Sequence, residues 1–205
     1  MRKGDLTRQA ILEAGLQMAS SVGLEAVTIG ELAKATGMSK SGLFAHFHSK
    51  ENLQVEILSF AGQVFAEQVV VPALNVPAGV PRIRALVENW ITWTERLTGG
   101  CIFVTASTEF SDRPGQVRDF LLRLQADWLQ SLVRMARSAI RVGDFRADID
   151  PGQFAFDLYS LLLGFHLYDK LLQDSKTRQR QQAALNQLLS AYRPVPPIPQ
   201  KATAP

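Results

Sequence analysis

The stretch from Thr28 to Lys50 constrains the fold of this chain more than any other part of the sequence. It reads TIGELAKATGMSKSGLFAHFHSK and predicts two short helices separated by a tight turn. Thr28 and Glu31 fit a capping box, in which the threonine oxygen accepts a backbone N–H and the glutamate reaches back to the cap. Gly37 lies where a helix end favours a left-handed residue, and Ser39 can cap the second helix. Two helices joined in this way form a helix-turn-helix, whose second helix enters a DNA major groove.

The second of these helices separates into an apolar and a polar side. Leu43, Phe44 and Phe47 are the apolar residues that seat it. The candidates for an outward, DNA-facing side are Ser39, Lys40, Ser41, Gly42 and His46. The alternative is a generic helical hairpin with a solvated face. The cap, the small residue Ala33, the turn glycine and the second cap are in register, which favours DNA binding.

Further positions extend this pattern from about Thr7 to Leu53. They are Ala10-Ile11-Leu12 with Ala14 and Ala19, Gly23 before Thr28, Ile29 with Leu32-Ala33, Gly37-Met38-Ser39-Lys40, Leu43-Phe44-Ala45-His46-Phe47 and Ser49-Lys50-Glu51. In these residues the run resembles the N-terminal DNA-binding domain of the TetR family of bacterial transcriptional regulators. One departure is Phe44, where the family usually has a tyrosine whose hydroxyl reaches a phosphate. That contact is therefore absent here.

The resemblance and the local pattern together assign roles to the candidate DNA-binding residues. Thr28, Lys40, Phe44 and Lys50 are expected to position the DNA backbone, and Ser39, Ser41, Gly42 and His46 to face the groove. Lys50 lies in the first turn of a helix, where its positive charge is unfavourable beside the positive end of the helix dipole. A phosphate bound at this helix end would reverse that penalty. The alternative is a solvated lysine. Gly42 costs roughly 1 kcal/mol against alanine in a helix. Close approach to DNA would explain it, and tolerated disorder of a short helix is the rival explanation.

The composition is that of an ordinary soluble globular protein, and the expected location is the cytoplasm. The 205 residues suit one domain or two small ones, and the formal net charge of +3 permits contact with a polyanion. Single Cys101 excludes an intrachain disulfide framework and suits a reducing compartment. No apolar run is expected to span a bilayer, and no signal peptide is recognised, so we expect no membrane association.

The rest of the chain predicts an all-α second domain. Expected helices run from Ser49 to about Val71, Arg82 to Leu97, Cys101 to Phe110, beyond Gly115 to about Val142, Pro151 to about Leu172, and Gln179 to Tyr192. Pro72, Pro77 and Pro81 predict a loop after the first of these. The expected organisation is a three-helix helix-turn-helix domain at residues 1–52, a helical effector-binding and dimerisation domain at 53–192, and a disordered Pro-rich tail at 193–205.

The helix expected from Pro151 to Leu172 has apolar residues on every side, which predicts burial all round. Because it lies late in a small domain, we expect a second copy of the chain to cover one side. The predicted dimer interface is a four-helix bundle across a two-fold axis, formed by Phe156, Tyr159, Leu163, Leu167, Ala184 and Leu188. Burial within a single chain is the alternative.

Large aromatic side chains with a few polar groups mark a candidate small-molecule pocket. These residues are Trp90, Trp93, Phe103, Thr105, Trp128, Phe165 and His166. The same residues could equally fill the core. For His166 taken alone, the favoured interpretation is a core histidine whose hydrogen bonds are satisfied within the protein. The TetR resemblance implies a pocket, because family members usually bind an effector in this domain. The expected effector is an apolar or aromatic small molecule.

Other chemistry finds little support in the sequence. His46 and His48 diverge on a helix, and no cysteine or carboxylate completes a metal set, so neither a metal nor a cofactor is expected. Cys101 lies in an apolar run, which favours an inert buried thiol. No catalytic signature is present. We therefore predict a homodimeric transcriptional regulator, a repressor released from a palindromic operator by its effector. The alternatives are a helical small-molecule-binding enzyme and an effector-independent DNA-binding factor.

Overall fold

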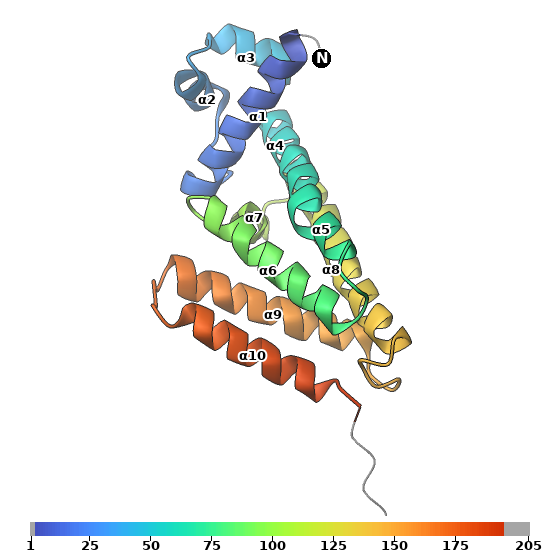
Figure 1. Cartoon of the computed structure of the whole chain (residues 1–205). Helices are drawn as coiled ribbons and strands as arrows, with labels where there is room; N and C mark the ends of the chain where they lie inside the picture. Colours follow the sequence, from blue (N-terminus) through green and yellow to red (C-terminus); the bar gives the residue numbers. More distant parts are fainter. Residues whose placement is uncertain (1–2, 195–205) are drawn as a thin grey trace, which may run out of the picture.

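The computed structural model describes residues 3–194, with side chains from Arg8 onward, and every regular element in that range is helical. The elements are α1 (Lys3–Val22), α2 (Ile29–Thr36), α3 (Lys40–Phe47), α4 (Lys50–Phe65), the π-helix η1 (Ala66–Val70), α5 (Val71–Leu74), α6 (Val80–Arg96), α7 (Ile102–Phe110), α8 (Gln116–Arg141), α9 (Pro151–Lys170) and α10 (Thr177–Ala191). Helices α1 to α3 form one end of the molecule, and α9 and α10 lie toward the other (Figure 1). The all-α prediction is confirmed. The predicted tail beyond Pro194 lies outside the described residues.

The caps of the helix-turn-helix form largely as the sequence predicts. Thr28 Oγ1 accepts the Glu31 N–H at 3.1 Å, and Ser39 Oγ accepts the Gly42 N–H at 3.1 Å. Gly37 closes α2 in the left-handed region, with φ of 67°. The second half of the capping box is replaced by another contact, because the Glu31 carboxylate pairs with Lys34 at 2.8 Å. These local bonds fix the angle at which α3 leaves α2.

A single helical segment, Lys50–Leu74, joins the two ends of the molecule (Figure 1). The predicted break at Pro72 is wrong, because the helix continues through it to Leu74. The wide π-turn Ala66–Val70 directly before the proline makes room for its ring, which would otherwise clash with the preceding turn. By length and composition this 25-residue segment could cross a membrane, contrary to the expectation from sequence. Here one face of it packs against α1, α6 and α8.

The C-terminal helices pack around the far end of that segment. Helix α8 contacts α4 on one side and α9 on another, and α10 lies along α9 (Figure 1). Helix α9 buries Phe154, Leu158 and Leu162 but leaves Phe156 65% exposed. Leu163 and Leu167 are also exposed, at 39% and 48%. The alternative that α9 is buried on all sides within one chain is therefore excluded.

Candidate DNA-binding surface and aromatic cavity

An open hollow lies between α2, α3 and the start of α4, and we call it the N-terminal hollow. Its lining residues are Thr28, Ile29, Gly30, Glu31, Ala33, Lys34, Met38, Lys40, Phe44 and Lys50. The structure thus brings together Thr28, Lys40, Phe44 and Lys50, the residues that the sequence assigns to the DNA backbone. The Phe44 ring is 54% exposed, although the other aromatic residue of α3, Phe47, is buried.

The basic residues around the hollow differ in how they are held. Lys50 Nζ donates to Glu25 Oε1 at 2.9 Å, and Arg113 approaches the same oxygen at 3.3 Å. The Lys50 hydrogen bond, opposed by partial burial, lowers the pKa of the Glu25 carboxyl. Among the residues that the structure describes, Lys40 has no acidic partner within 4.0 Å. Lys40 is therefore available to an external anion, whereas Lys50 would first have to share or leave Glu25.

The predicted groove-facing residues lie on the exposed side of α3. Ser39, Ser41 and His46 are exposed, and the Ser39 and Ser41 hydroxyls are 3.3 Å apart. A Cβ added at Gly42 would lie 3.0 Å from Ser39 Oγ. The N-cap itself therefore gives a reason for this glycine, because a side chain there would crowd the capping hydroxyl.

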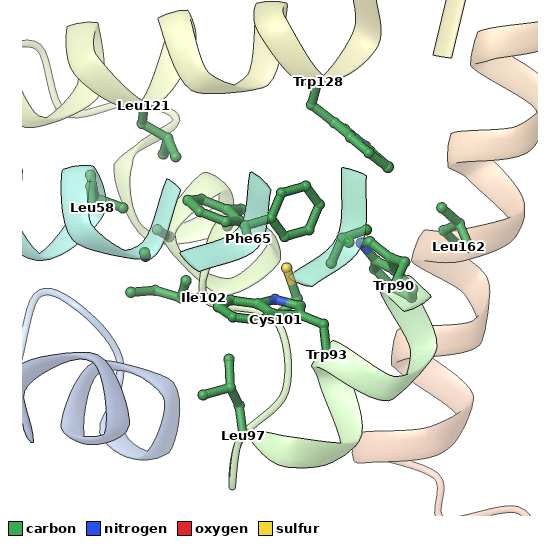
Figure 2. Close-up of a cluster of buried hydrophobic side chains, with 14 of the residues drawn as sticks. Leu58, Phe65, Trp90, Trp93, Leu97, Cys101, Ile102, Leu121, Trp128 and Leu162 are labelled. Carbon is green, nitrogen blue, oxygen red and sulfur yellow. The ribbon is translucent and has the colours of Figure 1, made fainter. Parts of the chain in front are cut away.

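A partly open space of about 260 Å³ lies among α4, η1, α6, α7, α8 and α9, and we call it the aromatic cavity. It is lined by Gly62, Phe65, Ala66, Val70, Trp90, Cys101, Phe103, Leu124, Gln125, Asp127, Trp128, Ser131 and Tyr159. Figure 2 shows Phe65, Trp90 and Trp128 converging on this region from three helices. The rings meet edge to face, with centroids 5.1 Å apart for Phe65 and Trp128 and 5.5 Å apart for Phe65 and Phe103.

One polar network lies in the cavity wall. Gln125 Nε2 donates to Phe103 O at 3.2 Å and to Ser107 Oγ at 2.8 Å, and the Tyr159 hydroxyl donates to Gln125 Oε1 at 2.9 Å. Burial raises the pKa of Tyr159 to about 12, so its hydroxyl stays protonated at neutral pH. The amide donors of Gln125 are thus occupied, while the Tyr159 oxygen can still accept a hydrogen bond.

The structure divides the predicted pocket residues into two layers. Trp90, Phe103 and Trp128 line the aromatic cavity. The others lie behind its wall: Trp93 packs edge to face on Phe65, Phe165 packs on Trp90, Thr105 donates to Ile102 O, and His166 accepts from the Cys101 backbone N–H. Tyr159, predicted for the dimer interface, lies in the wall instead.

His166 holds the start of α7 in place. The Cys101 N–H donates to His166 Nε2 at 3.2 Å, and a Cβ at neighbouring Gly100 would lie 2.5 Å from the same nitrogen. Burial, with a contribution from the Lys170 charge, lowers the pKa of His166. The neutral imidazole therefore accepts at Nε2, and protonation there would remove the acceptor. Burial likewise raises the pKa of the Cys101 thiol, which keeps it protonated.

Acidification is expected to destabilise the fold through His166. Its pKa in the folded chain lies below the ordinary 6.5, so the unfolded chain binds the proton more tightly. The stabilising contribution is therefore complete above pH 6.5 and is lost as the pH falls through 6.5 toward the lowered pKa. Urea unfolding across this range should show a smaller pH dependence for His166→Gln, which keeps an acceptor but does not titrate. An identical dependence in both proteins would contradict this role.

Hydrogen bonds join the helix-turn-helix end to the cavity end. Glu109 Oε2 on α7 accepts the Leu24 N–H at 2.9 Å and the Glu25 N–H at 3.2 Å. Ser20 Oγ on α1 accepts from Gly99 N and donates to Gly100 O, each at 3.0 Å. Helix α7 therefore contacts the aromatic cavity through Phe103 and the end of α1 through Glu109.

Sequence reasoning missed several lining residues of the aromatic cavity. Phe65 is one of them, although Leu58, Ala61 and Phe65 follow a three-four spacing that marks one buried face. Asp127 and Ser131 could have been found from their place beside Trp128 on the same helix. At the other end, Lys34 lines the N-terminal hollow but was not among the predicted DNA-binding residues.

Fold and sites together define a class of protein, an all-helical chain with a helix-turn-helix at one end and an aromatic cavity at the other. The family description "Bacterial regulatory proteins, tetR family" matches residues 11–57, and "Tetracyclin repressor-like, C-terminal domain" matches residues 79–185. The chain belongs to the TetR family of bacterial transcriptional regulators. The resemblance predicted from about Thr7 to Leu53 is confirmed, and the second match extends it into the C-terminal domain.

Individual relatives agree with this assignment. The transcriptional repressor DhaR of Mycobacterium sp. strain GP1 is 28% identical over 154 residues, 72% of this chain and 74% of that protein. A TetR regulator from Chloroflexus aurantiacus superposes with a TM-score of 0.81 at 23% identity, covering 93% and 96% of the two chains. AibR, solved with isovaleryl coenzyme A and operator DNA, gives a TM-score of 0.70 at 25% identity, covering 88% and 96%.

The chain is accordingly a ligand-responsive, DNA-binding transcriptional regulator. Members of this family are regulators and not enzymes, so the alternative of a helical enzyme is excluded.

Proposed function

We propose that the protein is a homodimeric repressor that leaves a palindromic operator when a small molecule fills the aromatic cavity. The observation that carries this proposal is the continuous segment Lys50–Leu74. Its first residue, Lys50, lines the N-terminal hollow, and its later residues, Phe65, Ala66 and Val70, line the cavity. AibR was solved with both a coenzyme A ester and operator DNA, which supports one chain of this fold serving both partners.

DNA recognition is assigned to the exposed surface of α2, α3 and the start of α4. Lys40 and Phe44 lie on the N-terminal hollow and would contact the backbone, together with Thr28 and with Lys50 once it is released from Glu25. Ser39, Ser41, Gly42 and His46 would face the groove. The proposed division places this unit at residues 1–52 and the effector and dimer unit at 53–192, in a cytoplasmic protein.

The dimer is assigned to the outer faces of α9 and α10. Phe156, Leu163 and Leu167 expose apolar surface along α9, and Ala184 and Leu188 of α10 are half-buried in this chain. Soluble chains rarely leave such a continuous apolar face uncovered, and closed two-fold pairing covers it with an identical one. A two-fold pair would present two recognition helices to successive major grooves of one operator.

Release from DNA follows from thermodynamic linkage. The effector is expected to bind more tightly when the two DNA-binding units are wrongly spaced for the operator. The factor by which bound effector weakens operator binding then equals the factor by which bound operator weakens effector binding. Ligand in the cavity displaces Phe65 or Ala66, and the shared helix carries that change to Lys50 and the adjoining α3.

Lys40→Ala is expected to weaken operator binding about tenfold and to make it less dependent on salt. Removing one phosphate-binding charge lowers the slope of log affinity against log salt concentration by about one unit per half-site. The operator is first obtained by selecting random duplex DNA with the purified protein at near-physiological salt. An enriched inverted repeat is expected, and the variant is then titrated over a range of salt concentrations.

The matched control is Lys176→Ala, an exposed lysine at the start of α10, far from the helix-turn-helix (Figure 1). It should bind the operator like the natural protein. Failure to enrich any sequence would overturn the proposed operator. If the salt dependence of operator binding is unchanged in Lys40→Ala, Lys40 does not contact the DNA, and the rest of the proposed interface is unaffected.

A further inference from the structure

The charge of the aromatic cavity sets limits on the ligand it can hold. No lysine, arginine or histidine is among its lining residues, and its one carboxylate is that of Asp127. An anionic ligand would lose its hydration there without gaining a cationic partner, which is costly in an apolar space. The lining therefore selects against anions before any detail of shape is considered.

Asp127 is an unpaired carboxylate at the edge of this cavity. It lies on α8, three residues after Leu124 and four before Ser131, both of which also line the space. Its side chain is exposed and has no basic partner within 4.0 Å among the described residues. Arg123, one turn earlier on the same helix, instead lies over the Phe120 ring at 5.2 Å. Its charge is therefore not neutralised by a described residue and is available to a cationic ligand in the cavity.

The rings supply the second half of a cation site. Phe65 meets Trp128 at 86° and Phe103 at 85°, and Trp128 meets Tyr159 at 77°. Phe65, Trp90, Phe103, Trp128 and Tyr159 all line the space, so aromatic side chains border it from α4, α6, α7, α8 and α9. The negative face of an aromatic ring attracts a cation, and such cages are suited to quaternary ammonium groups.

The size of the space limits the ligand further. At about 260 Å³ it is smaller than the roughly 300–1,000 Å³ of pockets for drug-sized molecules. The neutral polar groups of the lining are the Tyr159 and Ser131 hydroxyls and the Gln125 amide. A compact molecule with an apolar body and a single cationic group would fit this volume, pack against the aromatic rings and pair with the Asp127 carboxylate.

We propose that the effector is a compact organic ammonium ion, with its apolar body between Phe65, Trp90 and Trp128 and its charge toward Asp127. The inference rests on the proposed function, since it assigns a ligand class to the cavity proposed to release the operator. It narrows the expectation of an apolar or aromatic effector by adding a positive charge.

The test uses the full chain and probes of nearly equal shape, phenyltrimethylammonium, tert-butylbenzene and benzenesulfonate, which are cationic, neutral and anionic. Binding is followed by tryptophan fluorescence, because Trp90 and Trp128 line the cavity. The cation is expected to bind about tenfold or more tightly than the neutral probe, and the anion not detectably. Asp127→Asn should weaken the cation about fivefold and leave the neutral probe unchanged.

Asp119→Asn is the matched control, because it removes the same charge from an exposed position of α8 outside the cavity. It should leave all affinities unchanged. Equal binding of the cation and the neutral probe, with no effect of Asp127→Asn, would overturn the ammonium class while leaving the cavity as a ligand site. If no probe binds, both the class and the cavity assignment are overturned, whereas operator binding is judged separately by the DNA selection.

Discussion

A chain with lysine in place of both Leu163 and Leu167 is expected to be a monomer that no longer binds its operator tightly. Both side chains are exposed in the single chain, at 39% and 48%, so their replacement should leave the fold of one subunit intact. In the proposed dimer they are buried against a second copy, and each unpaired charge placed in an apolar interface costs several kcal/mol. Because two-fold symmetry repeats every substitution, dimer affinity should fall by more than about a hundredfold.

Sedimentation velocity at micromolar concentration measures the state of association, and operator titration measures its consequence. Leu122→Lys is the control, because Leu122 is similarly exposed, at 51%, but lies on α8. This variant should remain a dimer and bind DNA normally. If the doubly substituted chain still sediments as a dimer, the subunits associate through another surface, and the assignment of the interface to α9 is wrong.

The helix-turn-helix could be predicted from sequence because short-range bonds specify it. Thr28 and Ser39 each accept a backbone N–H three residues ahead, and Gly37 supplies a left-handed end that other residues adopt only with strain. The exception is also local. Glu31 could bond back to its cap or forward to Lys34, and the sequence contains both options without ranking them.

The aromatic cavity was only partly predictable because its lining comes from segments far apart in the chain. Trp90, Phe103 and Trp128 could be recognised as large aromatic residues, but the same composition describes Trp93 and Phe165, which lie behind the wall. Which ring faces the space depends on how α4, α6 and α8 are rotated against one another. That rotation is set by packing across the whole domain and not by the spacing within any one helix.

Pro72 shows how tertiary packing can override a local signal. Proline usually ends a helix, and the sequence predicts a loop there. In the structure Asn89 Nδ2 on α6 donates to the Val69 carbonyl at 3.0 Å, within the π-helical turn that precedes the proline. A side chain from another helix thus bonds a carbonyl of the irregular turn, and the segment continues through Pro72 as far as Leu74.

Glu109→Ala is expected to lower the free energy of unfolding by about 2–4 kcal/mol, since two backbone N–H groups lose their acceptor and each buried unsatisfied donor costs about 1–3 kcal/mol. These donors belong to Leu24, which is fully buried, and Glu25, and they lie 2.9 and 3.2 Å from one carboxylate oxygen. The carboxylate also packs on Gly23, where a Cβ would lie 1.9 Å from its other oxygen.

Glu109→Gln is the matched control. Its side-chain carbonyl can occupy the place of the accepting oxygen and keep both bonds, so only the charge is lost and the change should stay below about 1 kcal/mol. Urea unfolding measures both variants. Amide hydrogen exchange then locates the effect, and exchange at Leu24 and Glu25 should accelerate in Glu109→Ala by more than it does in α8 and α9.

This pattern would show that the helix-turn-helix end is held by α7 as well as by the long helix. Leu24 stands between them, because its N–H donates to Glu109 on α7 and its carbonyl accepts from Gln54 on α4 at 2.9 Å. Phe103, on the same short helix as Glu109, lines the aromatic cavity, so a ligand that moves α7 would pull directly on the end of α1. Equal stability and equal exchange in the alanine and glutamine variants would instead leave the Lys50–Leu74 helix as the route between the two ends.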